Sequence, residues 1–141
     1  MAVEITGTYT GNLKMELTHG PSGARLKTAA PVDNKGDGSS FSPTDLVASA
    51  LGACIVTTMA IVAEREGIDF TTASFRVEKH MQSDPRRIAK LPVEVHMPAG
   101  LSADQKKKLE NAGHTCPVHK SLLPAIEAEI RFVYPESSPN R

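Results

Sequence analysis

The fold of this chain is decided by one stretch in its first half, Ser42-Pro43-Thr44-Asp45-Leu46-Val47-Ala48-Ser49-Ala50-Leu51-Gly52-Ala53-Cys54. The stretch opens with helix-initiating residues. Ser42 is a good N-cap, Pro43 suits the first helical position, and the Asp45 carboxylate can reach back to the Ser42 amide. Gly67 is typical of a helix stop. The pattern therefore predicts one long helix between Ser42 and Gly67.

The faces of this helix carry different kinds of residue. Apolar residues recur at helical spacing and predict one broad buried stripe, made of Leu46, Val47, Ala50, Leu51, Cys54, Ile61 and Val62. Small residues predict a close approach by another element, with a second copy of the chain as the expected partner, and they are Ala48, Ser49, Gly52 and Ala53. Residues 46–63 are also uncharged over nearly the length of a bilayer span. Their many small and polar residues and their charged flanks nevertheless favour a buried helix.

The segments around the long helix predict strands and a loop. Alternating apolar and polar residues at 3–6 and 13–17 predict an opening meander of about three strands. A flexible loop is expected at 33–41, just before the helix. Beyond the helix, residues 70–81 and 88–97 predict a hairpin of two long strands with one mostly polar face.

The C-terminal part of the chain predicts a second helix and a last strand. Ser102 is the expected N-cap, Gln105 occupies the capping-box position, and Gly113 is expected just past the helix end. A final strand is expected at 126–133 and a polar tail at 135–141. Together the elements predict a fold of the α+β class.

Composition limits the classes of function. A chain of 141 residues with 40% hydrophobic content predicts one domain, residues 1–141, with a real core. The formal net charge is zero and aromatic residues make up only 4%, so neither nucleic acid nor a membrane is expected as a partner. The N-terminus, Met1-Ala2-Val3-Glu4, shows no secretory signal pattern, so a cytoplasmic location is expected.

The chain has two cysteines, and each lies in a setting that points to chemistry. Cys54 lies within the apolar helix, where burial raises the pKa of a thiol by default. Cys116 precedes Pro117, which places it at the N-cap of a short helix, where amides and the helix dipole favour a thiolate. With His114 and His119 able to add positive charge, local reasoning predicts that Cys116 is the more acidic thiol. Two such thiols form a redox couple if folding brings them together.

Simpler interpretations of these cysteines stay open. Cys54 fits a small core hydrophobe, and Cys116 fits a cap. The two cysteines with His114 and His119 could hold zinc, but their spacing matches no common structural zinc pattern, so no metal is expected. The remaining histidines are predicted to lie on the surface, and they are His19, His80 and His96.

The stretch 42–54, paired with His114-Thr115-Cys116-Pro117-Val118-His119-Lys120-Ser121-Leu122, resembles the OsmC/Ohr family of thiol-dependent peroxidases. The order of strands and helices around both motifs also matches, so the resemblance covers nearly the whole chain. It implies an α+β OsmC-like fold in which two chains intertwine as a homodimer. The long helices would pack centrally, with the sheets wrapped around them and the active sites at the dimer interface.

The resemblance also implies a reaction. Family members reduce organic hydroperoxides, and some reduce hydrogen peroxide. On this template Cys54 is the peroxidatic thiolate that becomes a sulfenic acid, and Cys116 is the resolving thiol that closes a disulfide. An external dithiol reductant then resets the pair, and no bound cofactor is expected.

The chain departs from the family at the groups that ionise the first cysteine. Well-studied peroxidase branches use an Arg and Glu pair, with the Glu directly after the helix-start proline, where this chain has Thr44. Asp45 is the nearest carboxylate, and Arg25, Lys35 or a residue of a partner chain stay open as the cation, with His119 as further support. The chain is therefore more similar to the general OsmC-like branch, whose substrates are less settled. A non-catalytic ligand-binding or redox-sensing dimer is the alternative function.

Overall fold

The computed structural model describes residues 1–135 of the 141-residue chain. Of the expected polar tail at 135–141, all but the first residue lies outside the described residues. Contacts between residues divide the chain into two compact units, Met1–Val47 and Ala48–Arg141, and each is described by itself. The expectation of a single domain stays a prediction.

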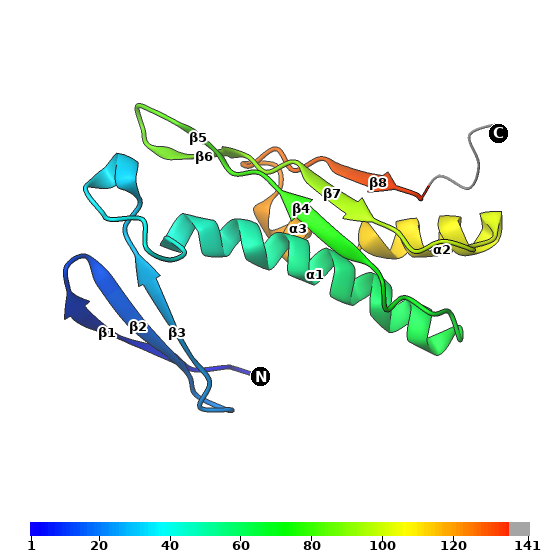
Figure 1. Ribbon diagram of the computed structural model, residues 1–141, viewed down its shortest axis with the longest axis horizontal. Helices are drawn as coiled ribbons and strands as arrows, with labels where there is room; N and C mark the ends of the chain where they lie inside the picture. The colour runs from blue at the N-terminus through cyan, green and yellow to red at the C-terminus, as the bar shows by residue number, and fades with distance from the viewer. Residues whose placement is uncertain (136–141) are drawn as a thin grey trace. The chain divides into compact units, whose positions relative to one another are not determined.

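The first unit contains the expected meander. Strands β1 (Ile5–Gly11), β2 (Lys14–His19) and β3 (Arg25–Ala29) form one antiparallel sheet in chain order (Figure 1). A short 3₁₀ helix, η1 (Val32–Asn34), follows and overlaps the start of the expected flexible loop. The N-terminal meander is therefore confirmed, and the flexibility of residues 33–41 stays a prediction.

The long helix α1 (Pro43–Arg65) begins and ends where the sequence predicts. The Ser42 N–H donates to the Asp45 carboxylate over 2.8 Å, and the Asp45 N–H donates to the Ser42 Oγ over 3.1 Å. These reciprocal bonds form a capping box that satisfies two backbone donors at the helix start. At the other end Gly67 has a φ of +70°, a left-handed conformation that glycine adopts readily, which lets the chain leave the helix.

The sheet of the second unit is more interrupted than the sequence predicts. Strands β4 (Ser74–Val77) and β7 (Val93–His96) pair antiparallel, and β8 (Ile130–Val133) runs parallel to β7. The two expected long strands each break, so that β5 (His80–Gln82) and β6 (Arg87–Lys90) form a separate two-stranded sheet. Pro92 stands at the break and has no N–H to donate to a ladder, which explains the interruption on its strand. The final strand was expected to begin at residue 126 and begins four residues later, at Ile130.

Two shorter helices complete the second unit. Helix α2 (Ala103–Gly113) has the predicted capping box between Ser102 and Gln105. Gly113 is the last helical residue and not the residue after the end, so that detail was wrong. A tertiary contact favours a glycine at this position, since a Cβ at Gly113 would lie 3.1 Å from Sδ of Met59 and 3.2 Å from Cζ of Phe132. Helix α3 (Pro117–Leu122) follows, with Cys116 at its N-cap as predicted.

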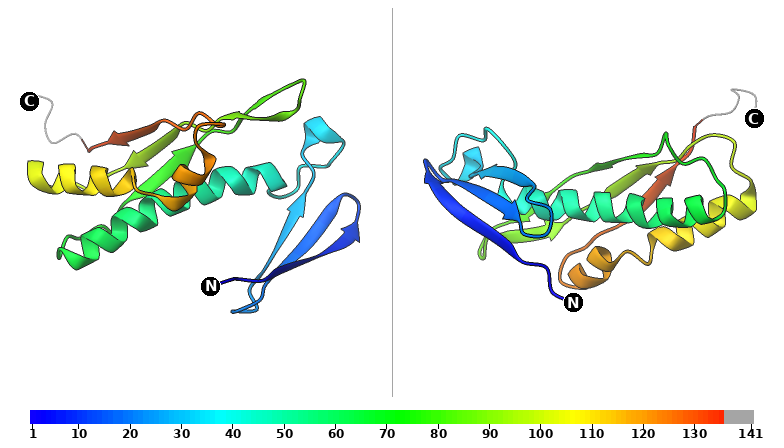
Figure 2. Two further views of the ribbon diagram at one scale, coloured as in Figure 1. Left: turned by 180° about the vertical axis from the view of Figure 1, so that it is seen from behind. Right: turned by 90° about the horizontal axis from the view of Figure 1, so that it is seen from below.

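Helix α1 buries a different stripe from the predicted one. Its buried residues recur at helical spacing, and they are Ala48, Leu51, Gly52, Ile55, Met59 and Ala63. A Cβ at Gly52 would lie 2.2 Å from Cε2 of Phe75, so α1 approaches β4 closely at this glycine. Figures 1 and 2 show α1 and α2 along one face of the β4-β7-β8 sheet. The close approach that the small residues predict is thus made, at Gly52, by a strand of the same chain.

The opposite stripe of α1 is exposed within this chain. Ala50, Ala53, Thr57 and Ile61 lie on it, and Ile61 is 60% exposed. The predicted burial of Ala50 and Ile61 is therefore wrong for the single chain. By length and composition alone, α1 is also long and apolar enough to cross a membrane, a test that core helices of soluble proteins pass as well.

Candidate functional site: two thiols at the junction of two helices

Cys116 is fixed by the start of helix α3. Its Sγ accepts a hydrogen bond from the His119 N–H over 3.4 Å, the geometry of a helix N-cap. The side chain is completely buried, with 0% exposure. The local sequence Cys116-Pro117 produces this arrangement because proline starts the helix one residue later.

Cys54 projects from the middle of helix α1 and is only half-buried. One helical turn further on, the Thr58 hydroxyl donates to the backbone carbonyl oxygen of Cys54 over 2.7 Å. The same hydroxyl oxygen lies 3.9 Å from Cys54 Sγ. Cys54 is therefore less deeply buried than Cys116, and its sulfur has a polar neighbour on its own helix.

Folding brings the two thiols into contact. Cys54 and Cys116 are both free cysteines, and their side chains are hydrogen-bonded to each other. The position of each cysteine is set by its own helix. The contact between them therefore results from the packing of α3 beside α1. The contact on which a redox couple depends is therefore present in the folded second unit, and the redox role of the two thiols stays a prediction.

The acidities of the two thiols are the reverse of the local expectation. Burial alone raises the pKa of Cys54, but hydrogen bonds, above all those with the Cys116 thiol and the Val118 amide, outweigh it and hold the pKa below its ordinary value. Burial raises the pKa of Cys116, and its hydrogen bond to Cys54 raises it further, against the opposing pull of the His119 amide. Cys54 is therefore the thiol that ionises first.

One N-terminal amide of α3, that of Val118, is hydrogen-bonded to both sulfurs, which helps to explain the reversal. The Val118 amide acts on Cys54 as well as on Cys116, so the donor set expected to favour Cys116 is shared. Cys116 is also the more deeply buried of the two. A buried thiol beside a thiolate keeps its proton and donates it as a hydrogen bond.

Asp45 and Thr44 belong to the helix start. The Asp45 carboxylate accepts from the Ser42 N–H in the capping box, and Thr44 Oγ1 lies 3.2 Å from Ser42 Oγ. Asp45 therefore has the capping role predicted for it. Its part in activating Cys54 stays a prediction.

The candidate cations Arg25 and Lys35 lie in the first unit. Arg25 is on β3 and pairs with Glu16 over 3.7 Å, and Lys35 follows η1 with a φ of +70°. The groups that set the pKa of Cys54 are instead all in the second unit. Thr58 and the Val118 amide were missed in the sequence, although the spacing of four residues between Cys54 and Thr58 places both on one helix face.

The histidines near Cys116 have other partners. The Nε2 of His119 lies 2.7 Å from the carbonyl oxygen of Ala128, to which it donates, so its ring ties α3 to the segment before β8. The ring of His114 packs edge-on against Phe132, with 5.7 Å between ring centroids. Within residues 1–135, no three His, Cys, Asp or Glu side chains gather closely enough to hold a metal ion. His119 supports Cys116 through its backbone amide.

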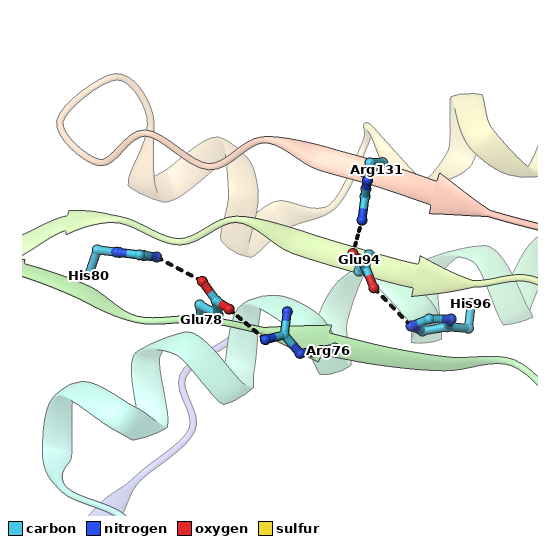
Figure 3. Close-up of polar contacts among 6 residues, drawn as sticks. All are labelled: Arg76, Glu78, His80, Glu94, His96 and Arg131. Atoms are coloured by element: carbon cyan, nitrogen blue, oxygen red, sulfur yellow. Dashed lines mark hydrogen bonds and ion pairs between the residues drawn. The ribbon is translucent and has the colours of Figure 1, made fainter.

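A second group of polar residues lies on the outer face of the sheet and is separate from the thiols. Figure 3 shows two chains of polar contacts there, Arg76–Glu78–His80 and Arg131–Glu94–His96. The arginines and glutamates of both chains line a hollow of about 270 Å³. All six side chains are at least partly exposed, so each pair contributes little to stability. The predicted polar face of the hairpin and the surface positions of His80 and His96 are confirmed.

Both cysteine motifs lie within a segment that matches a protein-family model. The family model described as OsmC-like protein matches residues 36–131, which contain both cysteine motifs. The chain belongs to the OsmC-like family and has its α+β fold, as the two motifs predict. No curated protein matches the chain.

Solved structures of other proteins share this fold. A proposed osmotic stress induced and detoxification response protein from Psychrobacter arcticus 273-4 is 36% identical, with a TM-score of 0.86 over 91% of this chain and 93% of its own. An organic hydroperoxide resistance protein OsmC from Legionella pneumophila is 20% identical, with a TM-score of 0.71 over 94% and 97% of the two chains.

A third structure extends the comparison. An organic hydroperoxide resistance protein from Elizabethkingia anophelis is 14% identical, with a TM-score of 0.75 over 96% and 97% of the two chains. At such low identity the Legionella and Elizabethkingia structures establish the fold alone. The class of protein is therefore an OsmC-like protein with two cysteines in contact.

Proposed function

We propose that this protein is a thiol-dependent peroxidase that reduces organic hydroperoxides with Cys54 as the peroxidatic thiol and Cys116 as the resolving thiol. One observation carries the proposal: the two free thiols are in contact, and the half-buried one is the more acidic. A peroxidatic thiol must be ionised and reachable by substrate. A resolving thiol must lie near the peroxidatic sulfur and must stay protonated until the sulfenic acid has formed.

The first step consumes the peroxide. The Cys54 thiolate attacks the terminal oxygen of ROOH, the O–O bond breaks, and RO⁻ leaves with its electron pair and takes a proton from water. Cys54 is then a sulfenic acid, oxidised by two electrons, and the alcohol ROH is the product. The position of Cys54 supports this step because the residue is only partly buried in the single chain.

The second step closes a disulfide. Cys116 loses its proton, its sulfur attacks Cys54 Sγ, and the hydroxyl group of the sulfenic acid leaves as water. The N–H groups of Val118 and His119 stabilise the Cys116 thiolate as it forms. An external dithiol then reduces the disulfide by two thiol–disulfide exchanges and is itself oxidised. Electrons therefore come from this reductant, and the proposal needs no resident cofactor.

The proposal includes a homodimer in the cytoplasm. A second copy covers the exposed stripe of α1 around Ala53, Thr57 and Ile61, which removes apolar surface from water. A cytoplasmic location suits the cycle because the reducing environment there returns the disulfide to thiols.

The test is consumption of cumene hydroperoxide by the reduced protein with excess dithiothreitol. Repeated turnover that disappears in Cys54→Ser supports the proposal. Cys116→Ser should stop at a Cys54 sulfenic acid or turn over more slowly. Absence of turnover by the wild-type protein, with both thiols shown to be free, would reject the peroxidase and leave the ligand-binding or redox-sensing dimer.

A further inference from the structure

We propose that the Thr58 hydroxyl holds the Cys54 sulfur in its ionised form by turning its O–H from the Cys54 carbonyl oxygen to Cys54 Sγ. The inference rests on the proposed role of Cys54 as the reacting thiol and adds a residue to that site. It assigns to this chain a neutral donor within the helix that carries the cysteine.

The geometry places one hydroxyl between two acceptors. Thr58 Oγ1 is 2.7 Å from the Cys54 carbonyl oxygen and 3.9 Å from Cys54 Sγ. A hydroxyl group has one proton and rotates about its C–O bond to suit its surroundings. With the thiol protonated, the carbonyl is the better acceptor, as observed. Once the thiol ionises, the negatively charged sulfur becomes the stronger acceptor because hydrogen bonds to charged groups are the stronger ones.

The other groups around the sulfur make such a donor useful. Cys54 is hydrogen-bonded to the Cys116 thiol and the Val118 amide of α3, and neither group carries a formal charge. The nearby His119 ring is turned to the Ala128 carbonyl. The ionised sulfur thus depends on neutral donors from α3 and, on α1, on Thr58. The side chain is partly buried, so water replaces its hydrogen bond only in part.

Thr58 is held in place by its own helix. The bond from its hydroxyl to the carbonyl four residues earlier fixes the side-chain rotamer before any ionisation. Turning the O–H then requires movement of one hydrogen, with no change in the position of the helix. The same helix offers a matched control in Thr57, which is of the same residue type, is exposed within the single chain and lies on the stripe that the proposed second copy covers.

The test measures the thiolate and does not need peroxidase activity. In a Cys116→Ser background Cys54 is the only thiol, so ultraviolet thiolate absorbance and iodoacetamide alkylation report on it alone. Thr58→Val keeps the shape and removes the hydroxyl, Thr58→Ser restores the hydroxyl, and Thr57→Val removes the neighbouring one. Circular dichroism checks that each variant is folded.

We expect Thr58→Val to raise the pH at which the Cys54 thiol is half ionised, which lowers the fraction of thiolate near neutral pH by about tenfold. Alkylation should slow by only about threefold, because a thiolate of higher pKa is the better nucleophile. Thr58→Ser should restore both readings, and Thr57→Val should change neither. A midpoint and alkylation rate unchanged in Thr58→Val would overturn the inference. Equal effects of Val and Ser at position 58 would also overturn it, because they would show a packing role.

The test of Thr58 can succeed or fail separately from the test of the proposed peroxidase function. If the alkylation pattern appears while no variant consumes hydroperoxide, Thr58 acts as a donor to the sulfur and the peroxidase proposal fails alone. If hydroperoxide is consumed equally by wild type and Thr58→Val, with equal alkylation rates, the donor role fails alone.

Discussion

Gly52 of helix α1 lies against the ring of Phe75 of strand β4, so closely that a Cβ at Gly52 would be 2.2 Å from Cε2 of the ring. This contact seats α1 on the sheet two residues before Cys54. It also explains why a glycine stands in the middle of a long helix, where it is unfavourable by about 1 kcal/mol relative to alanine.

Gly52→Ala should therefore destabilise the protein. The gain in helix propensity is smaller than the clash, and we expect a net loss of about 1–2 kcal/mol in the free energy of unfolding. Urea unfolding at fixed protein concentration measures it. In a Phe75→Leu background, which opens space beside the glycine, the effect of the same substitution should shrink. A Gly52→Ala protein as stable as the wild type would show that the contact relaxes without strain.

The order of thiol acidity predicts the order of labelling. Limited iodoacetamide at neutral pH should modify Cys54 before Cys116, because the thiolate is the reactive form and Cys116 is both protonated and buried. Peptide mass spectrometry of the trapped protein distinguishes the two sites. Preferential labelling of Cys116 would mean that the N-cap position outweighs burial after all.

The lowered pKa of Cys54 predicts that the stability of the protein depends on pH. The pKa of Cys54 is lower in the folded chain than its ordinary value of 9.0, so its ionisation stabilises the fold. This contribution is full above about pH 9 and is lost as pH falls through the folded pKa. The difference in unfolding free energy between wild type and Cys54→Ser should thus increase with pH in that window. Because Cys116 has the opposite shift and opposes folding at high pH, the comparison belongs in a Cys116→Ser background.

The capping box predicts a separable role for Asp45. Asp45→Ala removes the carboxylate that accepts the Ser42 N–H and should lower stability by about 1 kcal/mol. If capping is its whole role, alkylation of Cys54 keeps its rate. Gln105→Ala removes the equivalent group of the α2 capping box and is the matched control. A slower alkylation in Asp45→Ala alone would give Asp45 a part in activating the thiol.

The His119 ring is predicted to act on structure. His119→Ala leaves the Ala128 carbonyl without its 2.7 Å partner and should destabilise the protein by about 1–2 kcal/mol. The backbone amide that bonds Cys116 Sγ remains, so formation of the Cys54 sulfenic acid should be unaffected. Thermal unfolding and a single-turnover sulfenic-acid probe measure the two effects. Loss of sulfenic acid in a folded variant would assign the imidazole a direct part.

Features governed by neighbouring residues could be predicted well from the sequence. The start of α1 at Ser42, the capping box of α2 and the position of Cys116 before Pro117 all follow from backbone groups that must be satisfied within a few residues. The paired cysteine motifs also predict the family, and the family model confirms it. The roles of Cys54 and Cys116 in a reaction stay predictions.

Features governed by packing could not be predicted in this way. The α1 pattern is apolar or small on nearly every side, so periodicity does not distinguish the face that meets Phe75 from the face with Ile61. The break of the strand at Pro92 was missed although the proline itself indicates it, because proline has no N–H to donate to a ladder. The late start of β8 was missed as well. Gly113 was placed outside α2 because nothing local indicates its contact with Met59.

The sequence by itself determined where the helices begin, which residues cap them, and that the two thiols lie on different helices. Only the tertiary structure decided that these thiols touch and that Cys54 ionises before Cys116. The reason is physical. Helix starts depend on hydrogen bonds within one turn of chain, whereas the acidity of a thiol depends on its burial and on donors from other elements, here the thiol and amide that α3 brings to α1.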